Sequence, residues 1–227
     1  VTGVIHHFFE KFDPDEIISR MKRSRKWRQG NPSYDKYAHM SDAEIKQHWS
    51  EVGGEAAELG TEMHANIENF YNEDPHDESP KEFGLFSEFH KTHVENLDLE
   101  AFRAEWVIYS NKHRVAGCID MVYRNPKTGN YILADWKRSK EIKESHPFGT
   151  KGHPPLQDLD DCNWVKYSVQ LNLYKWIVEN CYGLPVEEMW LVILHPQQDT
   201  YILKRVPDHQ SLIPEVLMYW SVFKSTQ

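Results

Sequence analysis

The segments GCIDMVY at 117–123, NPKTGN at 125–130 and YILADWK at 131–137 decide the fold of this chain. The two outer segments are rich in residues that favour β-strands, and the middle segment has the Asn, Pro and Gly of a tight connection. Together they predict a β-hairpin that turns at Lys127 and Thr128. Such a hairpin fixes which side chains of the two strands face one another.

Two acids and a lysine fall on one face of this predicted hairpin. Folding it symmetrically sets Asp120 directly opposite Asp135, with the two Cβ atoms about 4.5–5.5 Å apart. Lys137 follows Asp135 by two residues, so the alternation of a strand puts it on the same face. Facing carboxylates repel each other, and a divalent cation between them removes the repulsion. Because a nearby lysine suits a reacting phosphate, the arrangement predicts metal-dependent cleavage of phosphodiester bonds.

An Asp or Lys on a strand is also commonly a solvated residue of the outer face. Here, however, Asp135 follows the apolar run YILA at 131–134, and Asp120 lies inside VAGCIDMV at 115–122. Both strands therefore have the composition of buried strands, and a buried carboxylate needs a partner. The pattern raises the case for a metal site, and at this point the metal site and the surface interpretation both stay open.

The composition is that of an ordinary globular protein with room for a sizeable core. The chain has 227 residues, of which 27% are charged and 40% hydrophobic, close to the usual proportions. It has no apolar run of membrane-spanning length and no signal-peptide pattern, so we expect no membrane partner. Because it begins at Val1 rather than Met, one interpretation is that it belongs to a larger polypeptide.

Three cysteines bear on the redox environment. Cys118, Cys162 and Cys181 are odd in number and widely spaced. This usage is typical of reduced thiols, so we expect an intracellular protein. The chain has no CxxC pair, and the sequence therefore predicts neither a zinc site nor an iron–sulfur cluster.

Positive charge is concentrated in two places, although the net charge is −9. Residues 20–28 hold six basic residues and no acidic one, and a second basic stretch covers 137–140. An acidic protein with local basic patches fits a groove for a phosphate backbone, whereas the alternative is a solvated helix face. The predicted nucleic-acid-binding residues are Arg20, Arg23, Arg25, Trp27, Arg138 and Lys140.

Hydrophobic periodicity and capping signals predict the order of helices and strands. The predicted helices cover 13–27, 41–50, 54–72, 81–96, 164–181 and 208–224. The predicted strands cover 101–109, 114–123, 131–137, 189–194 and 201–205. This order indicates an α/β fold with a central mixed β-sheet flanked by helices. We expect an N-terminal helical segment, 1–53, to pack on a core formed by 54–227.

A third acid is predicted near the hairpin face. Folding the first two strands about Asn111 and Lys112 pairs Glu105 with Cys118, on the face that holds Asp120. Glu105 is then a further candidate site residue, and a surface glutamate is the alternative interpretation.

Two helices supply the remaining candidates. His64 lies on the helix 54–72, and a neutral imidazole is a good ligand for Mn²⁺ and later transition metals. A single helical histidine is more often a core or surface residue. On the helix 164–181, Gln170 and Tyr174 are four residues apart and therefore share a face, which is a common arrangement on its own.

Five short motifs occur in a fixed order along the chain: Gly60-Thr61-x-x-His64, Glu105-Trp106, Gly117-x-x-Asp120, Asp135-Trp136-Lys137 and Gln170-x-x-x-Tyr174. In this order they resemble the PD-(D/E)xK nuclease superfamily, and specifically its RecB-like exonuclease branch. The pattern is similar to that of mitochondrial genome maintenance exonucleases and CRISPR-associated RecB-type nucleases. The resemblance implies a restriction-endonuclease-like core with an N-terminal helical extension.

The resemblance also implies roles for individual residues. The implied metal ligands are the side chains of His64, Asp120 and Asp135 and the backbone carbonyl of Trp136, and the implied ions are Mg²⁺ or Mn²⁺. Lys137 would position or activate water, while Gln170 and Tyr174 would orient the lysine or the substrate phosphate. Relatives that bind an iron–sulfur cluster use four cysteines, and the three scattered cysteines here argue against a cluster.

The sequence as a whole predicts a metal-dependent nuclease. The resemblance implies DNA as the substrate, single-stranded or with a free end, and exonuclease rather than endonuclease activity. Three alternatives stay open at this point: a cap-snatching-like RNA endonuclease, a non-catalytic nucleic-acid-binding module on a degenerate nuclease fold, and an unrelated α/β domain.

Overall fold

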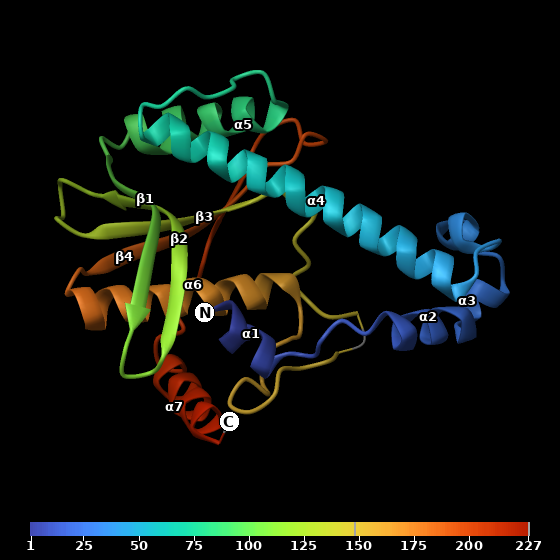
Figure 1. The fold of residues 1–227 in the computed structure, drawn as a ribbon. Coiled ribbons are helices and arrows are strands. Elements are labelled where there is room, and N and C mark those ends of the chain that lie inside the picture. Colours follow the sequence, from blue (N-terminus) through green and yellow to red (C-terminus); the bar gives the residue numbers. More distant parts are fainter. Residues whose placement is uncertain (148, 227) are drawn as a thin grey trace. The chain divides into compact units, whose positions relative to one another are not determined.

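A computed structural model describes residues 1–147 and 149–226 of the chain. Its centre is a five-stranded mixed sheet with strand order β1-β2-β3-β4-β5 (Figure 1). The strands are β1 (Glu100–Ser110), β2 (Val115–Arg124), β3 (Tyr131–Lys137), β4 (Val186–Ile193) and β5 (Ile202–Arg205). Neighbours are antiparallel except β3 and β4, which are parallel because α6 connects them. The predicted α/β fold with a central mixed sheet flanked by helices is confirmed.

The helices are α1 (Thr2–Phe8), α2 (Pro14–Arg23), α3 (Arg25–Arg28), α4 (Asp42–Tyr71), α5 (Lys81–Phe89), α6 (Asn163–Tyr182) and α7 (Ile213–Ser225). Two shorter helical segments, η1 (Pro32–Tyr37) and η2 (His90–Glu95), complete the set. Within the described part of the chain, no helix has the combined length and apolar character needed to cross a membrane.

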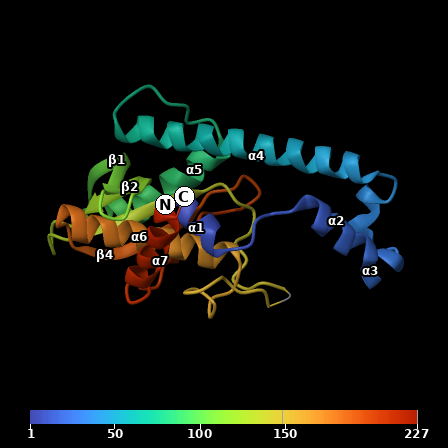
Figure 2. The same ribbon diagram turned by 60° about the horizontal axis from the view of Figure 1, so that its bottom comes forward.

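Helices cover both faces of the sheet (Figures 1 and 2). On one face, the strands pack with α6, α1 and α7, and this core includes Leu133, Leu171 and Ile177. On the other face, they pack with the last turns of α4 and with α5, and this core includes Ile67 and the ring of Trp136. Because each strand alternates its side chains, β3 supplies Leu133 to one core and Trp136 to the other.

The chain forms two compact units. One consists of Val1–Glu10 and Glu62–Gln227, and the other of Lys11–Thr61. Residues 1–10 group with the core, unlike the predicted division after residue 53, because α1 buries Val4, Ile5 and Phe8 in the core cluster. That the helical unit 11–61 packs on the core stays a prediction.

Inside the unit 11–61, local capping chemistry sets the helix ends. The Asp13 side chain accepts hydrogen bonds from the backbone N–H groups of Asp15 and Glu16 at 2.9 and 3.2 Å. Ser41 and Glu44 form a capping box, in which each side chain accepts a hydrogen bond from the other residue's backbone N–H. The predicted gap between 50 and 54 is absent, and α4 continues through Gly53 and Gly54.

The basic segment differs from the single helix predicted for 13–27. The helix α2 ends at Arg23, and Ser24 adopts an extended conformation with φ −65° and ψ 151°. The Ser24 side chain then accepts a hydrogen bond from the N–H of Trp27 and begins α3. Residues 20, 23 and 27 therefore do not form the continuous helix face that their spacing predicts.

The hairpin register is as predicted. Met121 pairs with Ala134 and Tyr123 with Ile132, as a symmetrical turn at 127 and 128 requires. However, the ladder ends at Met121 and Ala134, one step before Asp120 and Asp135 would pair. Because β2 and β3 separate at this point, the carboxylates of Asp120 and Asp135 do not face each other directly, which avoids the repulsion between them.

The predicted pairing of Glu105 with Cys118 is wrong. Cys118 pairs with Val107 instead, because the connection between Ser110 and Val115 is four residues long and shifts the register by two. A shift of two keeps the side chains on the same face, so Glu105 still points toward the predicted site. Its backbone has a positive φ of 43°, an uncommon conformation for a residue with a side chain.

Candidate metal centre

The candidate site lies where the sheet opens. Beyond Met121 and Ala134 the β1–β2 hairpin bends away from β3 (Figure 1). Alternation along β2 also breaks here, because Ile119 and Met121 pack in opposite cores although they are two residues apart. This opening lets α4, from one face of the sheet, and α6, from the other, contribute side chains to the same place.

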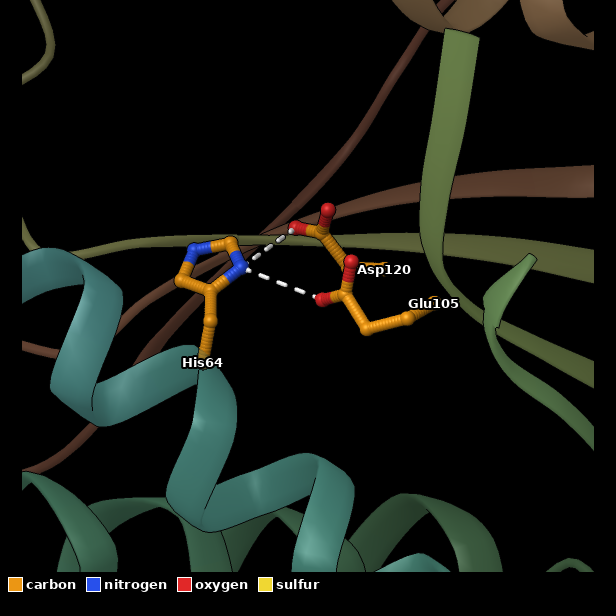
Figure 3. Close-up of side chains that lie close together, drawn as sticks. All are labelled: His64, Glu105 and Asp120. Atoms are coloured by element: carbon orange, nitrogen blue, oxygen red, sulfur yellow. Dashed lines mark ion pairs between the residues drawn. The ribbon is translucent and has the colours of Figure 1, made fainter. Parts of the chain in front are cut away.

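Three side chains from three elements converge at the opening (Figure 3). His64 comes from α4, Glu105 from β1 and Asp120 from β2. The Nδ1 atom of His64 lies 3.5 Å from Glu105 Oε1 and 3.6 Å from Asp120 Oδ2. One ligand atom from each residue lies within 4.8 Å of the other two. The convergence brings together residues that are distant in the sequence.

The backbone of Trp136 orients two of these three side chains. Its carbonyl oxygen lies 3.1 Å from His64 Nε2, which can donate its N–H to it. Its N–H donates to Asp120 Oδ2 at 2.7 Å. A metal-binding histidine commonly donates its other ring N–H to a carbonyl in this way, which fixes the ring. The Trp136 carbonyl contacts the imidazole here, and its predicted role as a ligand stays a prediction.

Burial and mutual charge shift the titration of the three groups. Burial and the neighbouring Asp135 raise the pKa of Asp120 to about 7. Burial lowers the pKa of His64, but its hydrogen bond to Glu105 and the charge of Asp120 outweigh this and raise it overall. The hydrogen bond to His64 lowers the pKa of Glu105. Without a metal, the two acids therefore favour the protonated form of the imidazole.

The donor set fits a divalent cation. Ligand atoms on one Mg²⁺ lie 2.0–2.1 Å from the ion, so two of them are at most about 4 Å apart. The two separations from His64 Nδ1, 3.5 and 3.6 Å, are within this limit, and all three ligand atoms lie within 4.8 Å of one another. A small contraction would therefore bring all three atoms into contact with one ion. An imidazole nitrogen with two carboxylates also suits Mn²⁺, which accepts nitrogen ligands more readily than Mg²⁺ does.

Asp135 and Lys137 form a buried ion pair beside the cluster. Asp135 is 2% exposed, and its Oδ2 atom lies 2.5 Å from Lys137 Nζ. Burial lowers the pKa of Lys137, but the charges of Asp135 and Asp120 outweigh it, so the pKa is raised overall. Lys137 is therefore an ammonium group at neutral pH and supplies positive charge rather than a base.

The helix α6 closes the other side of the site. Gln170 Nε2 donates to the Tyr174 hydroxyl at 2.9 Å, so the predicted pair does meet. Burial raises the pKa of Tyr174 to about 12, and the charges of Asp135 and Asp120 contribute to the rise. The tyrosine ring packs over Gly117, where an added Cβ would lie 2.5 Å from ring atom Cε1. This glycine leaves the space that the ring fills.

Two neighbours of the site, Cys118 and Tyr167, were not among the predicted site residues. Cys118 donates from its thiol to Glu105 Oε2 at 3.3 Å, and burial raises its pKa to about 12. The ring of Tyr167 lies 5.0 Å from Lys137 Nζ. Helical spacing could have indicated Tyr167, because it precedes Gln170 by three residues and so shares its face. The predicted pairing of Glu105 with Cys118 also places the thiol beside Glu105, although the strands pair in a different register.

The predicted nucleic-acid-binding residues of the core unit differ in their surroundings. Arg138 Nε lies 2.6 Å from Glu82 Oε1, and both side chains are mostly buried. Arg138 therefore acts first as half of a structural ion pair. Lys140 is exposed and has no ion pair among the described residues.

The basic residues of the unit 11–61 also divide into paired and unpaired ones. Arg20 Nη2 lies 2.6 Å from Glu16 Oε1. Arg23 and Arg25 are exposed and make no ion pair with any residue that the structure describes. Trp27 is half-buried, and its ring centre lies 5.7 Å from that of Tyr34.

Comparison with known proteins gives distant matches only. No family model and no curated protein matches the sequence. The fold is similar to a solved structure of SSO0001, with a TM-score of 0.36 and 18% identity over 81% of this chain and 68% of that one. It is also similar to a protein from Eubacterium rectale named "Putative exonuclease", with a TM-score of 0.43 and 11% identity over 72% of this chain and 64% of that one. Neither likeness is close enough to support a function.

Proposed function

We propose that the protein is a metal-dependent nuclease that hydrolyses phosphodiester bonds, with single-stranded or free-ended DNA as its substrate. The observation that carries the proposal is the convergence of His64, Glu105 and Asp120 beside the ion pair of Asp135 and Lys137. A carboxylate cluster with an imidazole suits a divalent cation, and an adjacent ammonium group suits a phosphate. The two features together favour phosphodiester chemistry over a purely structural ion.

Four side chains are proposed to hold Mg²⁺ or Mn²⁺: His64, Glu105, Asp120 and Asp135. When bound, such an ion stabilises negative charge on a phosphoryl oxygen and makes water a better nucleophile at neutral pH. For binding, His64 must release the proton on Nδ1, and Asp120 must be ionised. The Trp136 carbonyl would keep the ring in place through Nε2 while Nδ1 gives up its proton.

Lys137 and α6 are proposed to handle the substrate. The raised pKa of Lys137 means that its ammonium group meets the scissile phosphate as a positive charge. Gln170 and Tyr174 share a hydrogen bond on the α6 side of the site. We assign them to orienting the phosphate or the lysine, as the resemblance to RecB-like exonucleases implies.

DNA as the partner, and a free end as the point of attack, are proposed from that same resemblance. Arg23, Arg25 and Lys140 support a polyanionic partner, because they are exposed and free of ion pairs within the described residues. The Trp27 ring contacts Tyr34 and Lys22 Nζ and is partly exposed, so it can stack on an unpaired base. Arg20 and Arg138 already have acidic partners and contribute less to the proposal.

The test is cleavage of end-labelled single- and double-stranded DNA and RNA in Mg²⁺, Mn²⁺ or chelator. We expect the wild type to cut DNA with either metal and not with chelator, and Asp120→Asn to be inactive. Asp98→Asn is the matched control, because Asp98 is an exposed acid paired with Lys127. Cleavage of RNA alone would instead support the endonuclease alternative. Binding without cleavage under every condition would support a non-catalytic module.

A further inference from the structure

The ammonium group of Lys137 is held from two sides. Its Nζ atom lies 2.5 Å from Asp135 Oδ2 and 5.0 Å from the ring centre of Tyr167. Asp135 belongs to the same strand as Lys137, whereas Tyr167 belongs to α6. The two contacts therefore come from separate elements, and a change in one does not by itself remove the other.

The two contacts respond differently to a cation in the site. Asp135 is a proposed ligand, and a carboxylate that shares its charge with an ion attracts the ammonium group less. The face of an aromatic ring does not compete for Mg²⁺ or Mn²⁺, which take oxygen and nitrogen donors. The contact with Tyr167 would therefore persist when the contact with Asp135 weakens.

Lys137 needs a second contact because its side chain is long and flexible. A lysine has a four-carbon stem and many rotamers, so a single partner leaves the position of its charge poorly defined. The Lys137 side chain is only 19% exposed, and a cation–π contact is stronger where water is excluded. The ring of Tyr167 is also partly buried against the core, which holds it in place.

We propose that Tyr167 is a positioning residue, whose ring keeps the Lys137 ammonium group aimed at the substrate phosphate while Asp135 engages the metal. This inference rests on the proposed nuclease function. The ring rather than the hydroxyl carries the role, because within residues 1–147 and 149–226 the Tyr167 hydroxyl makes no hydrogen bond, whereas the ring faces the ammonium group.

Paired substitutions test the inference. Tyr167→Phe keeps the ring, and we expect its kcat to stay close to that of the wild type. Tyr167→Leu removes the ring, and we expect kcat to fall about tenfold with KM nearly unchanged. Tyr182→Leu is the control, because Tyr182 lies on the same helix and packs on Trp106. It should lower the melting temperature and leave the kcat of folded protein unchanged.

Two further measurements separate positioning from a loss of structure. Phenylalanines with increasing fluorine substitution at position 167 weaken the attraction for a cation at nearly constant shape, so kcat should fall stepwise. NMR of labelled lysine should show the Lys137 ε-protons shielded by the ring in the wild type and not in Tyr167→Leu.

The outcomes distinguish this inference from the nuclease proposal. Suppose that the wild type cleaves its substrate. If the kcat of Tyr167→Leu then equals that of the wild type, or if the kcat of Tyr167→Phe is as low as that of Tyr167→Leu, the positioning role is overturned and the nuclease proposal stands. If the wild type cleaves no substrate with any metal, the nuclease proposal is overturned and the positioning role with it.

Discussion

The charged residues around Asp120 and the basic residues of 20–28 differ in their burial and in their charged partners. Around Asp120, the side chains are largely buried and each contacts another charged group. In 20–28, Arg23 and Arg25 are exposed and make no ion pair with any described residue. Buried charges set one another's pKa, so a change in one alters all of them. Exposed charges act separately and stay available to a partner.

The largest effects are expected where the buried charges meet the proposed substrate. Asp135→Asn or Lys137→Ala should lower turnover at least about 100-fold, because each removes a charge that the reaction uses. Turnover at saturating Mn²⁺ is the measurement, with circular dichroism to confirm folding. Wild-type turnover in either variant would show that the buried pair is structural.

His64 tests whether the cluster is a metal site. His64→Ala should depress Mn²⁺-supported activity about tenfold or more and Mg²⁺-supported activity less, because Mg²⁺ favours oxygen ligands. A histidine that only packs would give another result. The variant would then melt earlier at every metal concentration, with turnover per folded molecule unchanged.

Gly117 tests the packing that supports the site. Gly117→Ala should lower the free energy of unfolding by about 1–3 kcal/mol, because the added methyl group collides with the Tyr174 ring. Gly84→Ala is the control, since a Cβ there meets open space inside α5. It should raise the free energy of unfolding by up to about 1 kcal/mol. Denaturant unfolding measures the free energy of unfolding of both variants. If Gly117→Ala were as stable as the wild type, the close approach of the Tyr174 ring to Gly117 would be contradicted.

The pH dependence of metal-free protein should reveal the buried cluster. Asp120 and His64 both have pKa values raised by folding. Their contribution to stability is complete at low pH and is lost as pH rises through their folded pKa values, near 7 for Asp120. The melting temperature should therefore fall between pH 5 and pH 8, by about 2–4 °C per kcal/mol lost.

Metal should reverse this trend, because it binds the deprotonated groups. The rise in melting temperature with Mn²⁺ should be larger at pH 8 than at pH 6. In Asp120→Asn, the melting temperature should depend less on pH than in the wild type, both with and without metal. A wild-type curve as flat as that of the variant would mean that Asp120 titrates normally.

The exposed basic segment should affect binding of the nucleic acid rather than turnover. Arg23→Ala and Arg25→Ala should each reduce the salt slope of single-strand binding by about 0.7, because each loses one phosphate contact. Trp27→Ala should weaken binding by about 1–3 kcal/mol without changing the slope. A titration in Ca²⁺, chosen to permit binding without cleavage, measures this.

Lys127→Ala is the control for that titration, because Lys127 is already paired with Asp98. If all variants bind like the wild type across the titration, the segment 20–28 lies outside the path of the nucleic acid. The binding groove would then have to lie nearer Lys140.

Local signals in the chain were sufficient for much of the fold. Turn residues at 125–130 predict the β2–β3 register correctly, because Asn125, Pro126 and Gly129 mark where the chain turns. The same logic fails for β1, where the connection of four residues could be centred in more than one way. The single helix predicted for 13–27 is wrong because Ser24 caps two helices. Its backbone N–H bonds to Met21 at the end of α2, and its side chain accepts from Trp27 at the start of α3.

By itself, the sequence determined the mixed sheet, the hairpin and the identity of the acids and the lysine, since these follow from alternation and turn chemistry within a few residues. Only the tertiary structure decided that His64, Glu105 and Asp120 converge. It also decided that Arg138 is buried against Glu82. The physical reason is that these contacts join separate elements, and periodicity along one strand or helix carries no information about distances between elements.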